Sequence, residues 1–91
     1  MPKFPLGQVV SATLGASAAL QEAQDSFTPY LARHGEGDWG EVNAEDTAEN
    51  ELSLRDGFRL LSAYTITSGT KIWVITERDR SATTILLPEE Y

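Results

Sequence analysis

The residues of this chain that could take part in catalysis are its single histidine and two of its arginines. His34 could exchange protons as a general acid or base near neutral pH, and Arg59 and Arg80 could hold a phosphate group through paired N–H donors. Thr83 or Thr84 could position that phosphate with a hydroxyl group. Together these residue types indicate chemistry on a phosphodiester, on condition that the fold brings them together.

Such a set has a loose counterpart in small ribonucleases of the barnase or RelE type. Those enzymes place basic residues, a histidine or glutamate and hydroxyl groups on an antiparallel sheet behind one or two helices. Residues 55–80 hold five basic and three acidic residues, a net charge of +2 in an acidic protein. The alternative is structural: a lone histidine near a helix C-terminus is more often stabilised by the helix dipole, and the alternating charges of residues 77–80 suit a solvated loop.

Recognisable catalytic and cofactor motifs are absent from the sequence. There is no G-x-S-x-G, no HExxH, no P-loop, no dinucleotide fingerprint and no cysteine nucleophile. One histidine with scattered carboxylates has no metal-ligand spacing. We therefore expect no metal and no cofactor, and a non-enzymatic role is favoured over the ribonuclease alternative.

The negative charge of the protein is concentrated in one segment. Seven acids lie between Arg33 and Arg55 with no basic residue among them: Glu36, Asp38, Glu41, Glu45, Asp46, Glu49 and Glu51. The rest of the chain is neutral, so this segment carries the entire net charge of −7. It is either a solvated helix whose acids suit the N-terminal dipole, a docking surface for a basic partner, or an imitation of nucleic acid. Binding to nucleic acid itself is disfavoured by the charge.

Aromatic residues offer a second candidate binding surface. Tyr64, Trp73 and Tyr91 would form an interface patch if they shared the outer face of the sheet, and otherwise they pack in the core and at the edge. Trp39 lies in a loop with three glycines in residues 35–40, and we expect it to fix this loop to the core. It is also a candidate for partner binding beside the acids.

Three helices are predicted before residue 58. The alanine-rich run 13–24 has high helix propensity, and Thr28 followed by Pro29 is typical of an N-cap, which gives a short helix ending near His34. Asn43 and Gly57 are a matched N-cap and C-terminal glycine around a third helix. The apolar face of this helix is thin and consists mainly of Ala44, Ala48 and Leu52, with Leu54 to one side. This helix is therefore expected on the surface.

The remaining sequence predicts strands. Alternating residues in 58–67, the β-branched run 72–76 and the segment 82–87 form a three-stranded antiparallel meander, with residues 68–70 as a hairpin loop of unsettled register. Residues 8–12 offer a fourth edge strand. The strand at 72–76 has large apolar residues on both faces, so its second face needs cover from a fourth strand, a loop or a second subunit. The fold class is α+β.

Five blocks of this sequence carry a family resemblance. They are GDWG (37–40), RLLSAY (59–64), WVITE (73–77), DRS (79–81) and TTILLPEEY (83–91). In this combination the chain resembles a family of small bacterial proteins described as plasmid-related. The resemblance implies a setting on a plasmid or another mobile element, and it implies no catalytic residues.

Length and composition limit the remaining possibilities. Ninety-one residues, 41% of them hydrophobic, suit a single domain over 1–91, with residues 1–7 as a flexible lead-in. The absence of cysteine and of any long apolar run fits a cytoplasmic protein without membrane contact. The sequence therefore predicts a non-enzymatic module that binds another protein or a second copy of itself through a sheet face, a sheet edge or the acidic segment.

Overall fold

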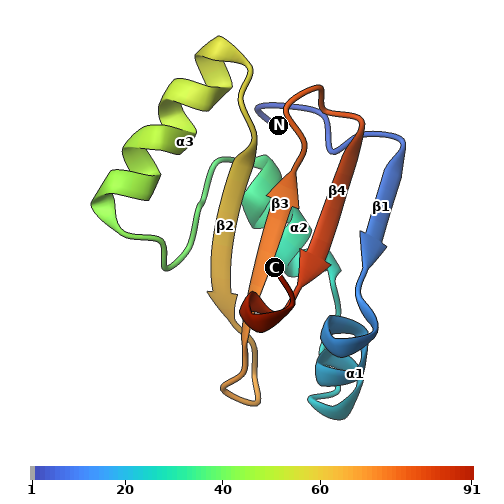
Figure 1. Cartoon of the computed structure of the whole chain (residues 1–91). Coiled ribbons are helices and arrows are strands. Elements are labelled where there is room, and N and C mark those ends of the chain that lie inside the picture. Colours follow the sequence, from blue (N-terminus) through green and yellow to red (C-terminus); the bar gives the residue numbers. More distant parts are fainter. Residues whose placement is uncertain (1) are drawn as a thin grey trace.

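The computed structural model describes residues 2–91, which form a mixed four-stranded sheet, three α-helices and a C-terminal 3₁₀ turn (Figure 1). In chain order these are β1 (Val9–Ala12), α1 (Leu14–Glu22), α2 (Thr28–Gly35), α3 (Ala44–Asp56), β2 (Leu60–Thr65), β3 (Lys71–Thr76), β4 (Ala82–Leu86) and η1 (Pro88–Glu90). The predicted α+β class is confirmed. None of the helices in residues 2–91 has both the length and the apolar character that crossing a bilayer requires.

The strand order is β1-β4-β3-β2, with β1 at one edge and β2 at the other. β4 pairs antiparallel with β3 and β3 with β2, but β1 runs parallel to β4. The predicted three-stranded antiparallel meander is therefore wrong, since the sheet has four strands and mixed pairing; the fourth edge strand offered at residues 8–12 is present as β1. Gly7 makes the extra strand possible: its φ is +95°, and a Cβ there would overlap the backbone of Ser81.

The hairpin between β2 and β3 has a loop of residues 67–69. Ile66 donates its N–H to the Thr70 carbonyl at 2.9 Å, and Gly69 has a φ of +92°. In this register Tyr64 pairs with Ile72, and Ala63 pairs with Trp73. Directly paired side chains share a face, so Tyr64 and Trp73 lie on opposite faces of the sheet.

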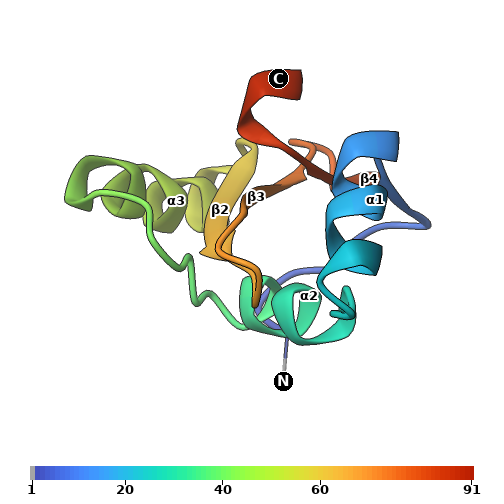
Figure 2. The ribbon, with the colours of Figure 1, turned by 90° about the horizontal axis from the view of Figure 1, so that it is seen from below.

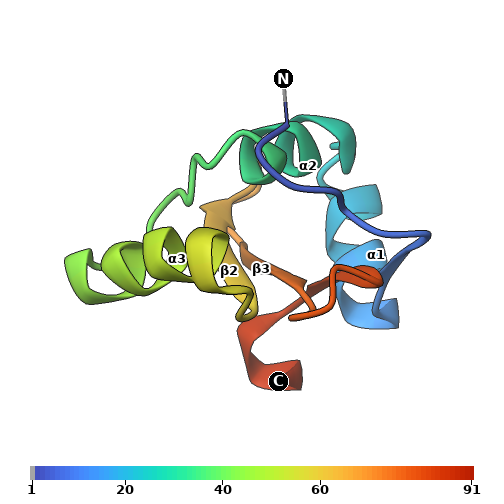
Figure 3. The same ribbon diagram turned by 90° about the horizontal axis from the view of Figure 1, so that it is seen from above.

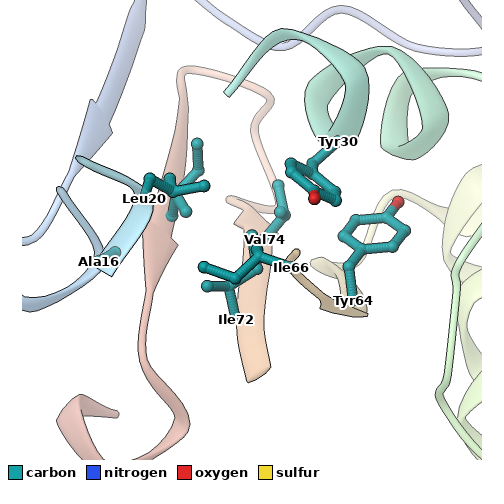
Figure 4. Close-up of a cluster of buried hydrophobic side chains, with 8 residues drawn as sticks. Ala16, Leu20, Tyr30, Tyr64, Ile66, Ile72 and Val74 are labelled. Atoms are coloured by element: carbon teal, nitrogen blue, oxygen red, sulfur yellow. The ribbon is translucent and has the colours of Figure 1, made fainter. Parts of the chain in front are cut away.

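Both α1 and α2 cover the same face of the sheet, which we call the inner face (Figure 2). The main core lies between these two helices and the inner face, and it is a cluster of side chains from both helices and from β2 to β4 (Figure 4). Its buried members are Ala16, Leu20, Tyr30, Tyr64, Ile66, Ile72, Val74 and Ile85. A second cluster, made of Phe4, Trp39 and Leu60, continues this core toward the N-terminal segment.

The opposite face of the sheet, the outer face, is covered within the chain itself. η1 and the C-terminus fold over this face (Figures 2 and 3), and Tyr91 packs on Trp73 with the ring centroids 5.6 Å apart. Ile75 and Leu86 are each only 6% exposed. The second face of β3 therefore receives cover from a single copy, although Trp73 remains half-buried.

The helix ends agree with the sequence at α3 and differ at α2. The Asn43 side chain accepts from the Asp46 N–H, and Gly57 is left-handed with a φ of +82°, as predicted. At α2 the N-cap is Phe27 rather than Thr28, with no side-chain cap bond, and Gly35 belongs to the helix.

The N-terminal segment is packed against the fold rather than free. Phe4 is buried in the second cluster, and the Lys3 N–H donates to the Gly35 carbonyl at 2.7 Å. Residues 2–7, which the sequence predicts as part of a flexible lead-in, lie as a strap over α2; Met1 lies outside the described residues.

Candidate functional site

The single histidine stands in a buried chain of hydroxyl groups that joins five parts of the fold. His34 Nδ1 lies 2.6 Å from the Ser62 Oγ of β2, and Nε2 lies 2.9 Å from the Thr76 Oγ1 of β3. Thr76 lies 2.7 Å from the Thr83 Oγ1 of β4, and Thr83 donates to the Leu6 carbonyl at 2.7 Å. His34, Ser62, Thr76 and Thr83 each have 0% exposure. We call these four residues the histidine chain.

The direction of hydrogen bonding in the histidine chain follows from its last acceptor. A carbonyl oxygen only accepts, so the Thr83 hydroxyl donates to Leu6 and must accept from the Thr76 hydroxyl. Thr76 in turn accepts from His34 Nε2–H, which leaves Nδ1 to accept from the Ser62 hydroxyl. The neutral Nε2–H tautomer satisfies every member, and burial lowers the pKa of His34 to about 4, with the nearby charge of Arg80 acting in the same direction.

Arg80 is near the histidine chain, but its guanidinium donates hydrogen bonds to backbone carbonyl groups. Nη1 donates to the Phe58 carbonyl at 2.6 Å, and Nη2 donates to the Ser53 carbonyl, near the end of α3, at 3.0 Å. Arg80 itself has a φ of +60°, in the turn before β4. Its donors are therefore engaged in joining this turn to α3.

The second arginine of the ribonuclease alternative lies on the other side of the sheet. The Arg59 guanidinium carbon is 5.1 Å from the centre of the Tyr91 ring, on the outer face. His34 and Thr83 are sealed from solvent on the inner face. The fold thus brings His34, Thr83 and Arg80 close together without access for a substrate, and it does not bring Arg59 to them. This geometry gives no support to catalysis by this set.

The acids of the segment 36–51 divide into engaged and free carboxylates. Asp38 pairs with Arg33 at 2.7 Å, and this hydrogen bond lowers the pKa of Asp38. Glu41 lies 3.7 Å from Lys71 Nζ, and Glu51 accepts from the Trp39 indole N–H at 2.7 Å. No ion pair is formed by the other four within the described residues: Glu36, Glu45, Asp46 and Glu49. Within residues 2–91 no group of His, Cys, Asp and Glu side chains has an arrangement suited to a metal ion.

The three candidate aromatic residues do not form one patch. Tyr64 is 1% exposed on the inner face, and its hydroxyl donates to the Asp38 carbonyl at 2.6 Å. Trp73 and Tyr91 do meet on the outer face. Trp39 is 5% exposed in the second cluster, so the prediction that it fixes its loop is confirmed, and it has little surface left for a partner.

On the free side of β2, the outward backbone groups of Leu61 and Ala63 are occupied. The Asn50 side chain donates to the Leu61 carbonyl at 2.7 Å and accepts from the Leu61 N–H at 3.1 Å, as a neighbouring strand would. The Ala63 N–H donates to the Trp39 carbonyl at 3.1 Å, and its carbonyl accepts from the Glu41 N–H at 2.7 Å. We call this side of β2 the sealed edge, because a further strand cannot pair with Leu61 and Ala63 without displacing these partners.

Asn50 also explains why the face predicted for α3 is wrong. Ala44, Ala48 and Leu52 are exposed, whereas Asn50 and Ser53 are buried. The helix lies against a strand edge, where the groups to be satisfied are backbone N–H and C=O, so polar side chains point inward. The apolar pattern of the sequence therefore gives no indication of Asn50.

We expect Asn50→Ala to lower the free energy of unfolding by about 1–3 kcal/mol, because the Leu61 N–H and C=O lose their partners in a partly buried place. The adjacent exposed residue provides the control: Glu49→Ala should change stability by less than about 0.5 kcal/mol. Urea unfolding followed by tryptophan fluorescence measures both. Equal effects of the two substitutions would contradict the role of Asn50 at the sealed edge.

The free side of β1 is different. The N–H groups of Gln8, just before the strand, and of Val9 both donate to the Ser81 carbonyl, and the Thr13 N–H donates to the Ile85 carbonyl. Within β1 the odd-numbered residues therefore bond to β4. Along a strand the bonding direction alternates, and the N–H and C=O groups of Val10 and Ala12 therefore point away from the sheet. No described segment runs beside β1 on this side (Figure 1). We call this side of β1 the open edge.

Exposed apolar residues gather at the open edge. Val9 is 57% exposed, Val10 46% and Leu14, the first residue of α1, 90%. Single exposed apolar residues are common on protein surfaces, whereas here three lie within six residues, beside backbone groups that have no partner in the described chain.

A hollow of about 720 Å³ lies between the N-terminal strap and α2. Its lining is mostly apolar and backbone, with Lys3 and Glu36 as the charged members. A small-molecule site needs several polar groups that converge on a ligand, and this hollow lacks them.

Comparison of the chain with protein-family models, with characterised proteins and with solved structures found no match. Its function therefore has to be inferred from its own geometry.

Proposed function

We propose that this chain is a non-enzymatic protein-interaction module that binds an extended protein segment by strand addition to the open edge of β1. One observation carries the proposal: the outward N–H and C=O groups of Val10 and Ala12 are flanked by exposed apolar side chains. In strand addition, main-chain hydrogen bonds provide affinity and alternate side chains provide specificity. The open edge offers both.

The contrast between the two edges of the sheet supports this proposal. Natural sheets protect their edges with charges, prolines, bulges or covering segments. At β2 the chain uses Asn50 and the backbone of residues 39–41 for that purpose. β1 is short, with four residues, but it has no charge, proline, bulge or covering segment in the described part of the chain, and it consists of two valines, a serine and an alanine.

The other candidate surfaces receive less support from the geometry. Three of the seven acids are engaged with Arg33, Lys71 and Trp39, which leaves a smaller charged surface for a basic partner or for imitation of nucleic acid. An accessory role on a plasmid or another mobile element remains part of the proposal and rests on the sequence blocks described above. The proposed cytoplasmic location rests on the lack of cysteine and of a long apolar run in the sequence.

Site-specific photocrosslinking in cells of the source organism tests the binding surface. With p-benzoylphenylalanine in place of Val9, we expect covalent adducts after irradiation, because this side chain lies on the outer face beside the open edge. The same probe in place of Leu52, which is 42% exposed on α3, is the matched control and should give none.

Combining the Val9 probe with Val10→Pro should abolish the adducts. Proline at position 10 has no N–H to offer at the open edge, and the hydrogen bonds between β1 and β4 are kept. An absence of adducts at position 9, or equal adducts at position 52, would contradict the proposal.

A further inference from the structure

We infer that the segment that pairs with the open edge is β1 of a second copy of this chain, antiparallel to the first and related to it by a twofold axis beside Ser11. The inference rests on the proposed function and names its partner. It follows from the spacing of the free backbone groups, the distribution of charge and the difference between the two sheet edges.

The free backbone groups of β1 complement themselves. Val10 and Ala12 are the outward residues, and a twofold axis beside Ser11 places Val10 of each copy opposite Ala12 of the other. In antiparallel sheets such opposed residues exchange both N–H···O bonds, and the residues between them form a non-hydrogen-bonded pair. Every outward group of Val10 and Ala12 thereby finds a partner, and the two Ser11 side chains face each other across the axis.

The distribution of charge favours a second copy over a basic or acidic partner. Residues 4–21 contain no charged side chain. Glu90 reaches the end of β1, but its carboxylate accepts from the Thr13 hydroxyl and from the Leu87 N–H. A strongly charged segment would therefore find no counter-charge along the open edge, whereas the uncharged 4–21 segment of another copy meets no electrostatic penalty.

The acidic segment does not oppose this pairing. α3 lies beyond β2, at the side of the sheet away from β1 (Figures 1 and 3). In the paired sheet the two α3 helices stand at the two far ends, and the remaining repulsion between two chains of net charge −7 is screened by salt over about 8–10 Å. The order of the strands thus keeps the charge away from the interface.

The sealed edge limits the assembly to two copies. Pairing β1 with β1 leaves the two β2 strands as the outermost strands, and both are occupied by Asn50 and by residues 39–41. An isologous contact uses the same patch on both subunits and closes on itself. The expected product is a dimer rather than a filament.

Sedimentation velocity of the purified full chain over a range of concentrations tests the stoichiometry. We expect a reversible dimer at twice the chain mass of 10.0 kDa. Val10→Pro and Val10→Lys should each raise the dissociation constant by about tenfold or more, since both block the edge. Leu52→Lys, at an exposed apolar site on α3, should leave it unchanged. Circular dichroism tests whether each variant is folded. If Val10→Pro unfolds, the dissociation constant of Val10→Lys tests the open edge in its place.

Disulfide trapping tests the register. The chain contains no cysteine, so Ser11→Cys introduces a single thiol beside the proposed axis. Non-hydrogen-bonded pairs in antiparallel strands have Cα atoms about 4.5 Å apart, within the range of a disulfide. Mild oxidation should yield a covalent dimer of Ser11→Cys and much less of Ser68→Cys, which lies in the hairpin loop.

The outcomes separate the inference from the proposed function. A chain that remains monomeric but whose Val9 probe captures a different protein would overturn the second-copy inference and support strand addition. A monomer without adducts would overturn both. A dimer that Val10→Pro and Val10→Lys leave intact would place the contact elsewhere and overturn the inference.

Discussion

Substitution of Gly40 by alanine is expected to lower the free energy of unfolding by about 3 kcal/mol or more. Alanine would have to adopt a left-handed backbone conformation, and its Cβ would overlap neighbouring atoms. The φ of Gly40 is +72°, and a Cβ there would overlap the carbonyl oxygen of Ala63 and lie 2.6 Å from the Tyr64 ring. The overlap is with the sealed edge itself. To relieve it, residues 39–41 would have to move away from β2, and both of their bonds to Ala63 would lengthen. Urea unfolding measures the loss.

Gly57 provides the matched control for Gly40→Ala. Its φ is +82°, almost the same, but a Cβ there has no neighbour within 4 Å. Gly57→Ala therefore carries the backbone cost alone, about 1–2 kcal/mol, and the difference between the two variants measures the steric part. Equal losses for Gly40→Ala and Gly57→Ala would show that β2 tolerates movement of residues 39–41, and the sealed edge would then be weaker than the hydrogen bonds indicate.

The parts of the fold that the sequence predicted are those controlled by local chemistry. Asn43 and Gly57 determine the ends of α3 through a side-chain cap and a left-handed residue, which are properties of single positions. The β-branched run in β3 specifies a strand in the same local way. The position of Trp39 in the core was also predicted, because a large aromatic residue among glycines has few other ways to be buried.

The parts that the sequence did not predict depend on residues far apart in the chain. The parallel pairing of β1 with β4 joins residues more than 70 positions apart, and its local signal is a glycine before two valines. The prediction of the buried face of α3 was wrong because this helix lies against a strand edge. There the Asn50 side chain can bond to the backbone of Leu61, which a leucine side chain cannot do.

The sequence does contain a pattern that indicates the histidine chain. Ser62, Thr76 and Thr83 stand at inward positions of their strands, where the alternation leads one to expect apolar residues. Polar residues at inward positions need a partner inside the protein, and His34 is the one imidazole in the sequence that could serve all of them. Their register was still required to show that Ser62 and Thr76 reach opposite nitrogens of the ring.

The buried histidine predicts how stability depends on pH. The pKa of His34 falls from its ordinary value of 6.5 in the unfolded chain to about 4 in the folded chain, mainly because of burial. Between these two values the unfolded chain binds a proton that the folded chain does not, so stability is full above pH 6.5 and falls as the pH falls toward 4. The loss attributable to His34 should reach about 3 kcal/mol near pH 4. Unfolding in urea at intervals between pH 7.5 and pH 4 measures it.

His34→Gln separates this contribution from that of the carboxylates. Glutamine can donate and accept at one buried site without titrating, so the variant should be less stable at pH 7 but should lose about 3 kcal/mol less than the natural chain between pH 7 and pH 4. The hydrogen-bonded acids Asp38 and Glu41, whose pKa values are lowered, begin to lose their stabilising effect in both proteins below about pH 5, and this loss cancels in the comparison. Because His34 is the only histidine, its ring protons can be followed by NMR without assignment, even if the glutamine variant does not fold. A midpoint near 6.5 in the folded protein would contradict the neutral tautomer and the direction of hydrogen bonding derived for the histidine chain.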